Sequence, residues 1–251
     1  MSNQPFTYSP SVWIVPLFLT LLIWFVFLTD HFFNFDLNRF GISPRTYFGL
    51  VGIFCSPFLH SDLSHIANNT FPVFIFTMAL VYFYRELSLK VLLFGILFSG
   101  FSTWIIGRSG NHIGASGLIY VLFSFLFFKG FLTKYYRLMA LSFAIVLVYG
   151  GMIWYVFPQP AALNANQNIS WEGHLSGLLT GFIFAIYYKT PIYCADKVYA
   201  WQHADFDAQS DDFMQHFDSD GNFSPKPKDD LPSSEVVTFP EIIYHFKEKS
   251  D

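Results

Sequence analysis

The chain has 251 residues, of which 53% are hydrophobic, 21% aromatic and only 13% charged. Soluble globular domains carry about 25% charged residues, so this composition excludes an ordinary soluble domain and predicts a polytopic membrane protein. The net charge of −4 is unevenly divided, because residues 1–190 hold nine basic and five acidic residues and residues 191–251 hold five basic and thirteen acidic. We therefore expect a membrane domain over 1–190 and a polar, acidic, largely disordered cytoplasmic tail over 191–251.

Six apolar stretches approach the roughly 20 residues that a helix needs to cross a bilayer. They lie at about residues 11–29, 63–84, 91–107, 115–131, 135–157 and 171–188. The N-terminus lacks the features of a cleaved signal peptide, so we expect the first stretch to remain as a helix. The lightly charged connection over residues 30–58 is expected to lie along the membrane interface. The sequence thus predicts an all-α bundle of six transmembrane helices.

Basic residues give the bundle an orientation. We assign seven to one side and three to the other: Arg85, Lys90, Lys129, Lys134, Arg137, Lys189 and Lys197 against Arg39, Arg45 and Arg108. The positive-inside rule then places both termini in the cytoplasm. The second, fourth and sixth stretches all begin on the outer side, and Cys55 and Cys194 lie on opposite sides, so no disulfide is expected.

A serine lies at the start of the fourth stretch, within the sequence Gly114-Ala115-Ser116-Gly117. The glycines let another backbone approach Ser116, and a helix N-terminus favours developing negative charge. Tyr120 follows four residues later, on the same face of the helix. Taken alone, this turn is more simply explained as a packing surface of small residues, which membrane helices often use.

A histidine at the start of the sixth stretch changes that interpretation. His174 is followed by Gly177 and Gly181, a spacing that lets a second helix come close. If the fourth helix is that partner, His174 can act as general base toward Ser116. A hydrogen-bonded core histidine is the alternative, but ionisable residues within membranes are costly and indicate function by default.

The second stretch adds two polar side chains that share one helix face. His65 and Asn69 can both donate hydrogen bonds to an oxyanion at the depth of Ser116. For His60 and His112 a structural role is favoured over a catalytic one. No carboxylate is placed to orient His174, since Glu172 points to a different face, so a Ser-His dyad is predicted rather than a triad.

Two other classes of membrane protease are disfavoured, because the chain lacks a pair of acidic residues within a stretch and a His-Glu-x-x-His sequence. In the tail, residues 218–222 are similar to part of a calcium loop, but Asp229 stands where such a loop needs Glu.

These residues resemble the rhomboid family of intramembrane serine proteases over about residues 12–188. The resemblance rests on His60-x4-His65-x3-Asn69, Gly114-Ala115-Ser116-Gly117 with Tyr120, and Gly173-His174-x2-Gly177-x3-Gly181. It implies that Ser116 is the nucleophile and His174 the base, that His65, Asn69 and the Ser116 N–H form the oxyanion hole, and that Tyr120 packs against His174. It also implies single-span membrane proteins as substrates, with no metal, cofactor or nucleic-acid partner.

One family feature is missing, since many rhomboids carry a Trp-Arg pair in the first loop and this connection has no tryptophan. Two alternatives stay open. One is a catalytically silent rhomboid relative that binds membrane clients. The other is a metal- or haem-handling membrane protein, because five histidines fall near the outer side: His31, His60, His65, His112 and His174. A bacterial inner membrane is the expected location, and the sequence does not indicate the natural substrate, the oligomeric state or the role of the tail.

Overall fold

The computed structural model describes residues 8–158, 170–190, 199, 204–207 and 211–225. It forms two units, residues 1–194 and residues 195–251, which are considered separately. Among the described residues every named element is a helix, and β pairing is limited to two isolated bridges. The prediction of an all-α fold is therefore confirmed.

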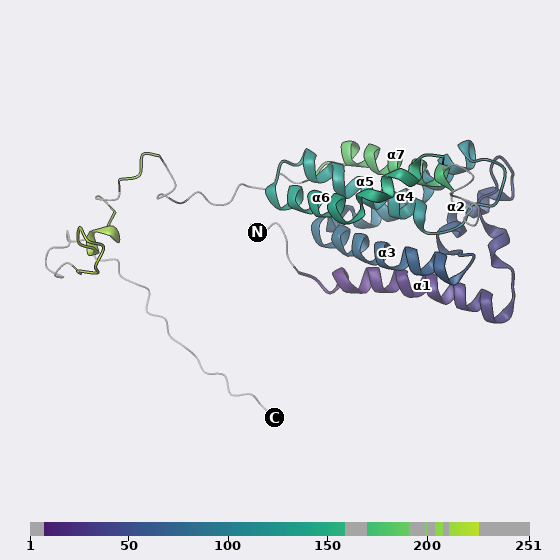
Figure 1. The fold of residues 1–251 in the computed structure, drawn as a ribbon, viewed down its shortest axis with the longest axis horizontal. Helices are drawn as coiled ribbons and strands as arrows, with labels where there is room; N and C mark the ends of the chain where they lie inside the picture. Colours follow the sequence, from purple (N-terminus) through teal and green to yellow (C-terminus); the bar gives the residue numbers. More distant parts are fainter. Residues whose placement is uncertain (1–7, 159–169, 191–198, 200–203, 208–210, 226–251) are drawn as a thin grey trace, which may run out of the picture. The chain divides into compact units, whose positions relative to one another are not determined.

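The long helices of the first unit follow the apolar stretches of the sequence (Figure 1). Their bounds are α1 Ser11–Phe33, α3 Leu63–Phe83, α4 Arg85–Ile106, α5 Ser116–Leu132, α6 Tyr136–Tyr149 with its 3-10 continuation η3 Gly150–Val156, and α7 Trp171–Tyr187. Three short helices occupy the first connection: η1 Leu37–Phe40, α2 Gly49–Cys55 and η2 Ser56–Phe58.

Four of these segments are long and apolar enough to cross a membrane: α1, α3, α4 and the combined segment Tyr136–Val156. Helices α5 and α7 have 17 residues each. At 1.5 Å per residue they are about 25 Å long, somewhat less than the hydrocarbon core. The structure thus supports an integral membrane protein, and the number of six spans stays a prediction.

Two connections differ from the sequence prediction, because the helices extend into them. Tyr84 alone separates α3 from α4, so Arg85 and Lys90 lie within α4. Lys129, which we had assigned to a cytoplasmic connection, is buried inside α5. Its ammonium group donates hydrogen bonds to the carbonyl oxygens of Ala185, at 3.0 Å, and Tyr188. A cation is stabilised there because these carbonyls end helix α7.

Helix α5 is the centre of the bundle and contacts α3, α4, α6 and α7. Its middle is buried without interruption from Leu118 to Leu126. Helix α7 approaches it through glycines: a Cβ on Gly177 would lie 2.3 Å from the Gly117 carbonyl oxygen, and one on Gly181 would lie 2.3 Å from that of Val121. The predicted close approach of the helices that carry Ser116 and His174 is therefore present.

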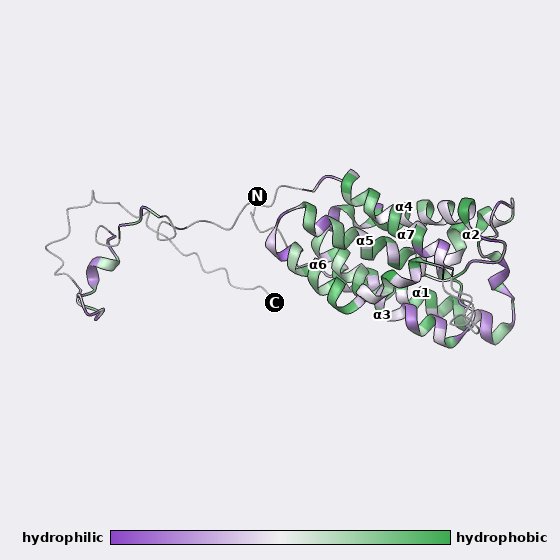
Figure 2. Cartoon of the chain, turned by 45° about the horizontal axis from the view of Figure 1, so that its top comes forward, coloured by the Kyte–Doolittle hydropathy of each residue, from purple (hydrophilic) through white to green (hydrophobic). Residues whose placement is uncertain are grey.

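Helix α1, in contrast, packs by large side chains and leaves much of its apolar surface uncovered. Trp24 Nε1 donates a hydrogen bond to Thr70 Oγ1 of α3 at 3.0 Å, and the Trp13 and Phe74 rings are 6.1 Å apart. Phe18 and Phe25 are each about two-thirds exposed. Figure 2 shows that hydrophobic residues extend along the helices and that hydrophilic ones gather toward the bundle ends. This distribution is that of a protein solvated by lipid.

The first connection is fixed to the end of α4. Arg45 donates hydrogen bonds to the carbonyl oxygens of Ile105, at 2.9 Å, and Gly107, at 2.7 Å, and Trp104 Nε1 donates one to the Thr46 carbonyl at 2.9 Å. A tryptophan and an arginine thus tie this connection to the bundle, although the tryptophan comes from α4. The sequence could not reveal that Trp104 bonds to this connection, since Trp104 lies far along the chain.

In the second unit, residues 211–225 contain a 3-10 turn, η5 Met214–His216, and an isolated bridge between Phe217 and Phe223. The Asp218 carboxylate accepts hydrogen bonds from the N–H groups of Asn222, at 2.8 Å, and Asp220, at 3.0 Å. These bonds lower the pKa of Asp218, and the bond from the Asn222 N–H has the largest effect. The carboxylate that starts the possible calcium loop is therefore occupied by its own turn, and most of the predicted disordered tail lies outside the described residues.

Candidate active site

Ser116 is the first residue of α5 and follows a turn that only glycine can make. Gly114 has φ +112°, and a Cβ there would lie 2.5 Å from His65 Nε2. The Gly114 N–H is held by the Ser56 carbonyl at 2.9 Å. No side chain caps the N-terminus of α5, so its first N–H groups are available to an incoming negative charge.

His174 is held by a backbone carbonyl in the orientation that a general base needs. Its ring is buried, and Nδ1 lies 2.9 Å from the Tyr155 carbonyl oxygen. Because a carbonyl can only accept, Nδ1 carries the proton and Nε2 of the neutral ring is unprotonated. The sequence could not predict this partner, because every residue has a backbone carbonyl and the residues of η3 form no recognisable motif.

Tyr120 stacks on His174, as the family resemblance implies. The ring centroids are 4.3 Å apart with planes 17° from parallel, and the Tyr120 hydroxyl donates to the Met152 carbonyl at 2.5 Å. The backbone of η3 therefore holds both rings. Within the described residues His174 makes no hydrogen bond to Ser116, and the Tyr155 contact is its one side-chain bond. Catalytic hydrogen bonds are often long without substrate.

The two predicted oxyanion donors are placed differently. His65 lies in the first turn of α3, and its Nε2 faces Gly114, two residues before Ser116. Asn69 is buried, and its Nδ2 donates to the His65 carbonyl oxygen at 2.8 Å. The structure therefore brings His65 to the Ser116 turn, and records for Asn69 only a bond within its own helix.

The first turn of α3 also restricts the protonation of His65. Asp62 caps the helix by accepting from the His65 N–H at 2.9 Å, and it accepts the Ser61 hydroxyl at 2.7 Å. These bonds lower the pKa of Asp62, and the bond from the Ser61 hydroxyl has the largest effect. Since the Ser61 proton is engaged, its oxygen accepts from His65 Nδ1 at 3.2 Å. His65 Nε2 can thus donate only when the ring is doubly protonated or Ser61 rotates.

His112 joins the loop before α5 to the start of α7. Its Nε2 donates to the Arg108 carbonyl at 3.0 Å, so Nδ1 accepts from the Ser170 hydroxyl at 2.6 Å. Ser170 in turn caps α7 by accepting from the Gly173 N–H at 3.2 Å. Buried Glu172 adds a second link, since its Oε1 accepts from the Arg108 N–H at 3.2 Å. These links position the helices of Ser116 and His174, and no carboxylate hydrogen-bonds to the His174 ring among the described residues.

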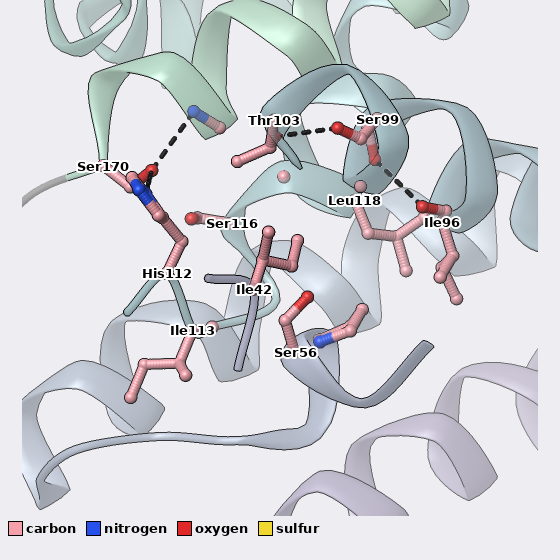
Figure 3. Close-up of a pocket in the computed structure, with 15 residues that line it drawn as sticks. Ile42, Ser56, Ile96, Ser99, Thr103, His112, Ile113, Ser116, Leu118 and Ser170 are labelled. Atoms are coloured by element: carbon pink, nitrogen blue, oxygen red, sulfur yellow. Dashed lines mark hydrogen bonds between the residues drawn. The ribbon is translucent and has the colours of Figure 1, made fainter. Parts of the chain in front are cut away.

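A small cavity of about 30 Å³ lies beside Ser116, between the ends of α4, α5 and α7. Figure 3 shows the Ser116 hydroxyl directed toward the side where His112 and Ser170 lie. Ser99 and Thr103 of α4 also line the cavity. This volume is large enough to hold a water molecule. In the described part of the chain, no three His, Cys, Asp or Glu side chains are placed to share a metal ion.

Comparison with known proteins agrees with this architecture. The family model described as "Rhomboid domain" matches residues 47–190. An uncharacterised protein of Mycobacterium tuberculosis, Rv1337, is 31% identical over 178 residues, which cover 68% of this chain and 72% of the relative. An uncharacterised protein of Mycobacterium leprae, ML1171, is 30% identical over 179 residues, 68% of each chain. The chain therefore belongs to the rhomboid family.

Proposed function

We propose that this chain is an intramembrane serine endopeptidase that cleaves single-span membrane proteins in or near their transmembrane segments. The observation that carries the proposal is the state of His174. Its Nδ1 is bound to the Tyr155 carbonyl, its face is covered by Tyr120, and its helix touches the backbone of the helix that begins at Ser116. This arrangement prepares Nε2 as a base next to a serine at an open helix N-terminus.

In the proposed reaction Ser116 Oγ attacks the scissile carbonyl carbon while His174 Nε2 takes the hydroxyl proton. The N–H groups at the start of α5, with His65 and Asn69, stabilise the resulting oxyanion. The C–N bond then breaks as His174 returns its proton to the leaving amine. A water molecule, deprotonated by His174, then attacks the acyl-enzyme. The ester bond breaks, the new carboxyl end leaves, and His174 returns the proton to Ser116 Oγ. His65 takes part when Ser61 rotates away from Nδ1, which lets the neutral ring carry its proton on Nε2.

The proposal also includes the membrane in which the protein lies and its orientation there. Both termini face the cytoplasm of a bacterial inner membrane, and water reaches the site from the outer side. Exposed polar residues at the start of α3, among them Ser61 and Asp62, support the entry of water there.

Cleavage of a model single-span substrate by purified protein in detergent tests the mechanism. Ser116→Ala and His174→Ala should each reduce kcat by about a thousandfold or more, the scale seen when a member of such a catalytic unit is removed. Ser64→Ala, which changes an exposed serine at the start of α3, is the matched control and should cleave normally. If Ser116→Ala cleaves as fast as the wild type, the mechanism is wrong.

A catalytically silent, client-binding relative is the second candidate, favoured by the missing hydrogen bond between Ser116 and His174. Labelling with a fluorophosphonate separates the two, because only an activated serine reacts. Labelling that is lost in Ser116→Ala supports the protease. Substrate capture with neither labelling nor cleavage supports the silent relative.

A further inference from the structure

A second cavity lies where α1 ends and α3 begins, apart from the cavity at Ser116. Its volume is about 280 Å³. We name it the acidic pocket, and its lining residues are Phe27, Asp30, His31, Asn34, Asp36, Asn38, His60 and Ser61. Two acidic residues are among the described residues that line this space, whereas no described lysine or arginine lines it.

The acidic pocket has an excess of unused hydrogen-bond acceptors. Asp30 accepts one bond, from the Leu37 N–H at 2.8 Å, and the Asp36 carboxylate accepts none from the described residues. The ion pair seen in the described part of the chain, between Arg108 and Glu172, involves neither. Asn38 Oδ1 is also buried without a partner among these residues. Buried polar groups are normally satisfied, so the Asn38 oxygen indicates a missing donor. Asp36 is exposed and Asp30 is half-buried, and both leave carboxylate oxygens available to a ligand.

His60 points to the same conclusion. It is 3% exposed, and its ring nitrogens meet the Phe58 carbonyl without forming a hydrogen bond of regular geometry with any described residue. Burial, helped by the neighbouring His65, lowers the pKa of His60 to about 4. The ring is therefore neutral at pH 7 and one of its nitrogens is an acceptor.

The acidic pocket is also close to the candidate active site. The His60 and His65 rings meet edge to face with centroids 4.9 Å apart. On its other side His65 lies against Gly114, in the turn that leads into Ser116. A group held in the acidic pocket is thus separated from the Ser116 turn by two imidazole rings.

We propose that the acidic pocket binds the ammonium or guanidinium group of a Lys or Arg that flanks the transmembrane segment of the substrate. Such a group carries only donors and a positive charge, which complement two carboxylates, an amide oxygen and a neutral imidazole. This assignment rests on the proposed protease function and adds a specificity determinant to it.

Other cations fit the lining less well. No three His, Cys, Asp or Glu side chains among the described residues are arranged to hold a metal ion. The ammonium headgroup of a lipid has the same chemistry as lysine, but its phosphate would need basic partners that the acidic pocket lacks. A basic side chain of the substrate brings the charge without the phosphate.

The test compares single-span substrates that differ by Lys or Gln at successive positions beside the transmembrane segment. Wild type and the double variant Asp30→Asn/Asp36→Asn are assayed in vesicles with and without phosphatidylethanolamine. Both changes are nearly isosteric: the amide introduced at position 30 keeps an oxygen for the Leu37 N–H, and asparagine tolerates the φ of +55° at position 36. Glu86→Gln, which changes an exposed acid at the start of α4, is the control.

We expect the wild type to prefer one Lys substrate by about tenfold in kcat/KM, the effect of hydrogen bonds to a charged group. The double variant should lose this preference and cleave the Gln substrate normally, whereas Glu86→Gln should keep it. A preference that survives in the double variant refutes binding of the basic group in the acidic pocket and leaves the proposed protease function intact. A loss that affects both substrates equally and depends on phosphatidylethanolamine identifies a lipid site and also refutes it. If wild type cleaves neither substrate, the protease function fails and this assignment fails with it.

Discussion

Two helix contacts of the bundle are built in opposite ways. The α5–α7 seam, meaning the contact of those two helices, brings backbones together at Gly177 and Gly181 and adds polar links. Ser124 Oγ donates to the Leu178 carbonyl at 2.7 Å, and Lys129 bonds to the end of α7. The α1–α3 seam joins large side chains, and much of α1 stays exposed. Both are apolar, so hydrophobicity alone does not explain the difference.

The difference follows from what each seam must hold. Lipid is as apolar as leucine, so helices in a membrane associate through close packing and hydrogen bonds. A backbone contact without intervening side chains fixes the separation of two helices, whereas long side chains can adjust by changing rotamer. The candidate nucleophile and base are carried by the α5–α7 seam, where a misplacement of about 1 Å can cost a hundredfold in rate.

Among changes to the two seams, the largest effect is expected from a side chain inserted into the α5–α7 seam. In Gly181→Val the new Cβ would meet the Val121 carbonyl oxygen at 2.3 Å and Ser124 Cβ at 2.8 Å. The helices must separate, at a cost of about 1–3 kcal/mol or more. We expect a lower Tm in detergent and at least a hundredfold loss of cleavage.

Leu179→Val supplies the matched control, because Leu179 is half exposed on the same helix. It introduces the same β-branched residue on the lipid-facing side and should leave Tm and cleavage within experimental error. Equal effects of the two variants would show that the close approach of α5 and α7 has no special role.

An intermediate effect is expected at the other end of the seam. Lys129→Met keeps an apolar stem of similar length but leaves the Ala185 and Tyr188 carbonyls without their donor. Loss of a hydrogen bond to a charged group costs about 1.5–3 kcal/mol. We expect a lower Tm with a smaller loss of cleavage, since the site lies at the opposite end of α5. Lys134→Met, at an exposed position, should change neither quantity, and a Tm loss as large as that of Lys129→Met would show that charge alone matters.

The sequence predicted those parts of the fold that depend on side-chain type and spacing. The glycines after His174 predicted the close contact with α5, and Tyr120 was expected against His174 from the family resemblance. The Tyr155 carbonyl that orients His174 could not be predicted, because a backbone group leaves no signature in the sequence. Lys129 was misassigned because charge suggested a connection, whereas its partners are backbone carbonyls distant along the chain.

The smallest effect is expected in the α1–α3 seam. Trp24→Phe removes the indole N–H that donates to Thr70 Oγ1 at 3.0 Å but keeps an aromatic ring. The Thr70 hydroxyl remains satisfied, since it also donates to the Ile66 carbonyl at 2.8 Å. The cost should therefore be at most about 1 kcal/mol, measured as a small fall in Tm, with cleavage unchanged. A loss of cleavage comparable to that of Gly181→Val would contradict the distinction between the two seams, because it would mean that the position of α1 controls Ser116 and His174 as strongly as the glycine contact does.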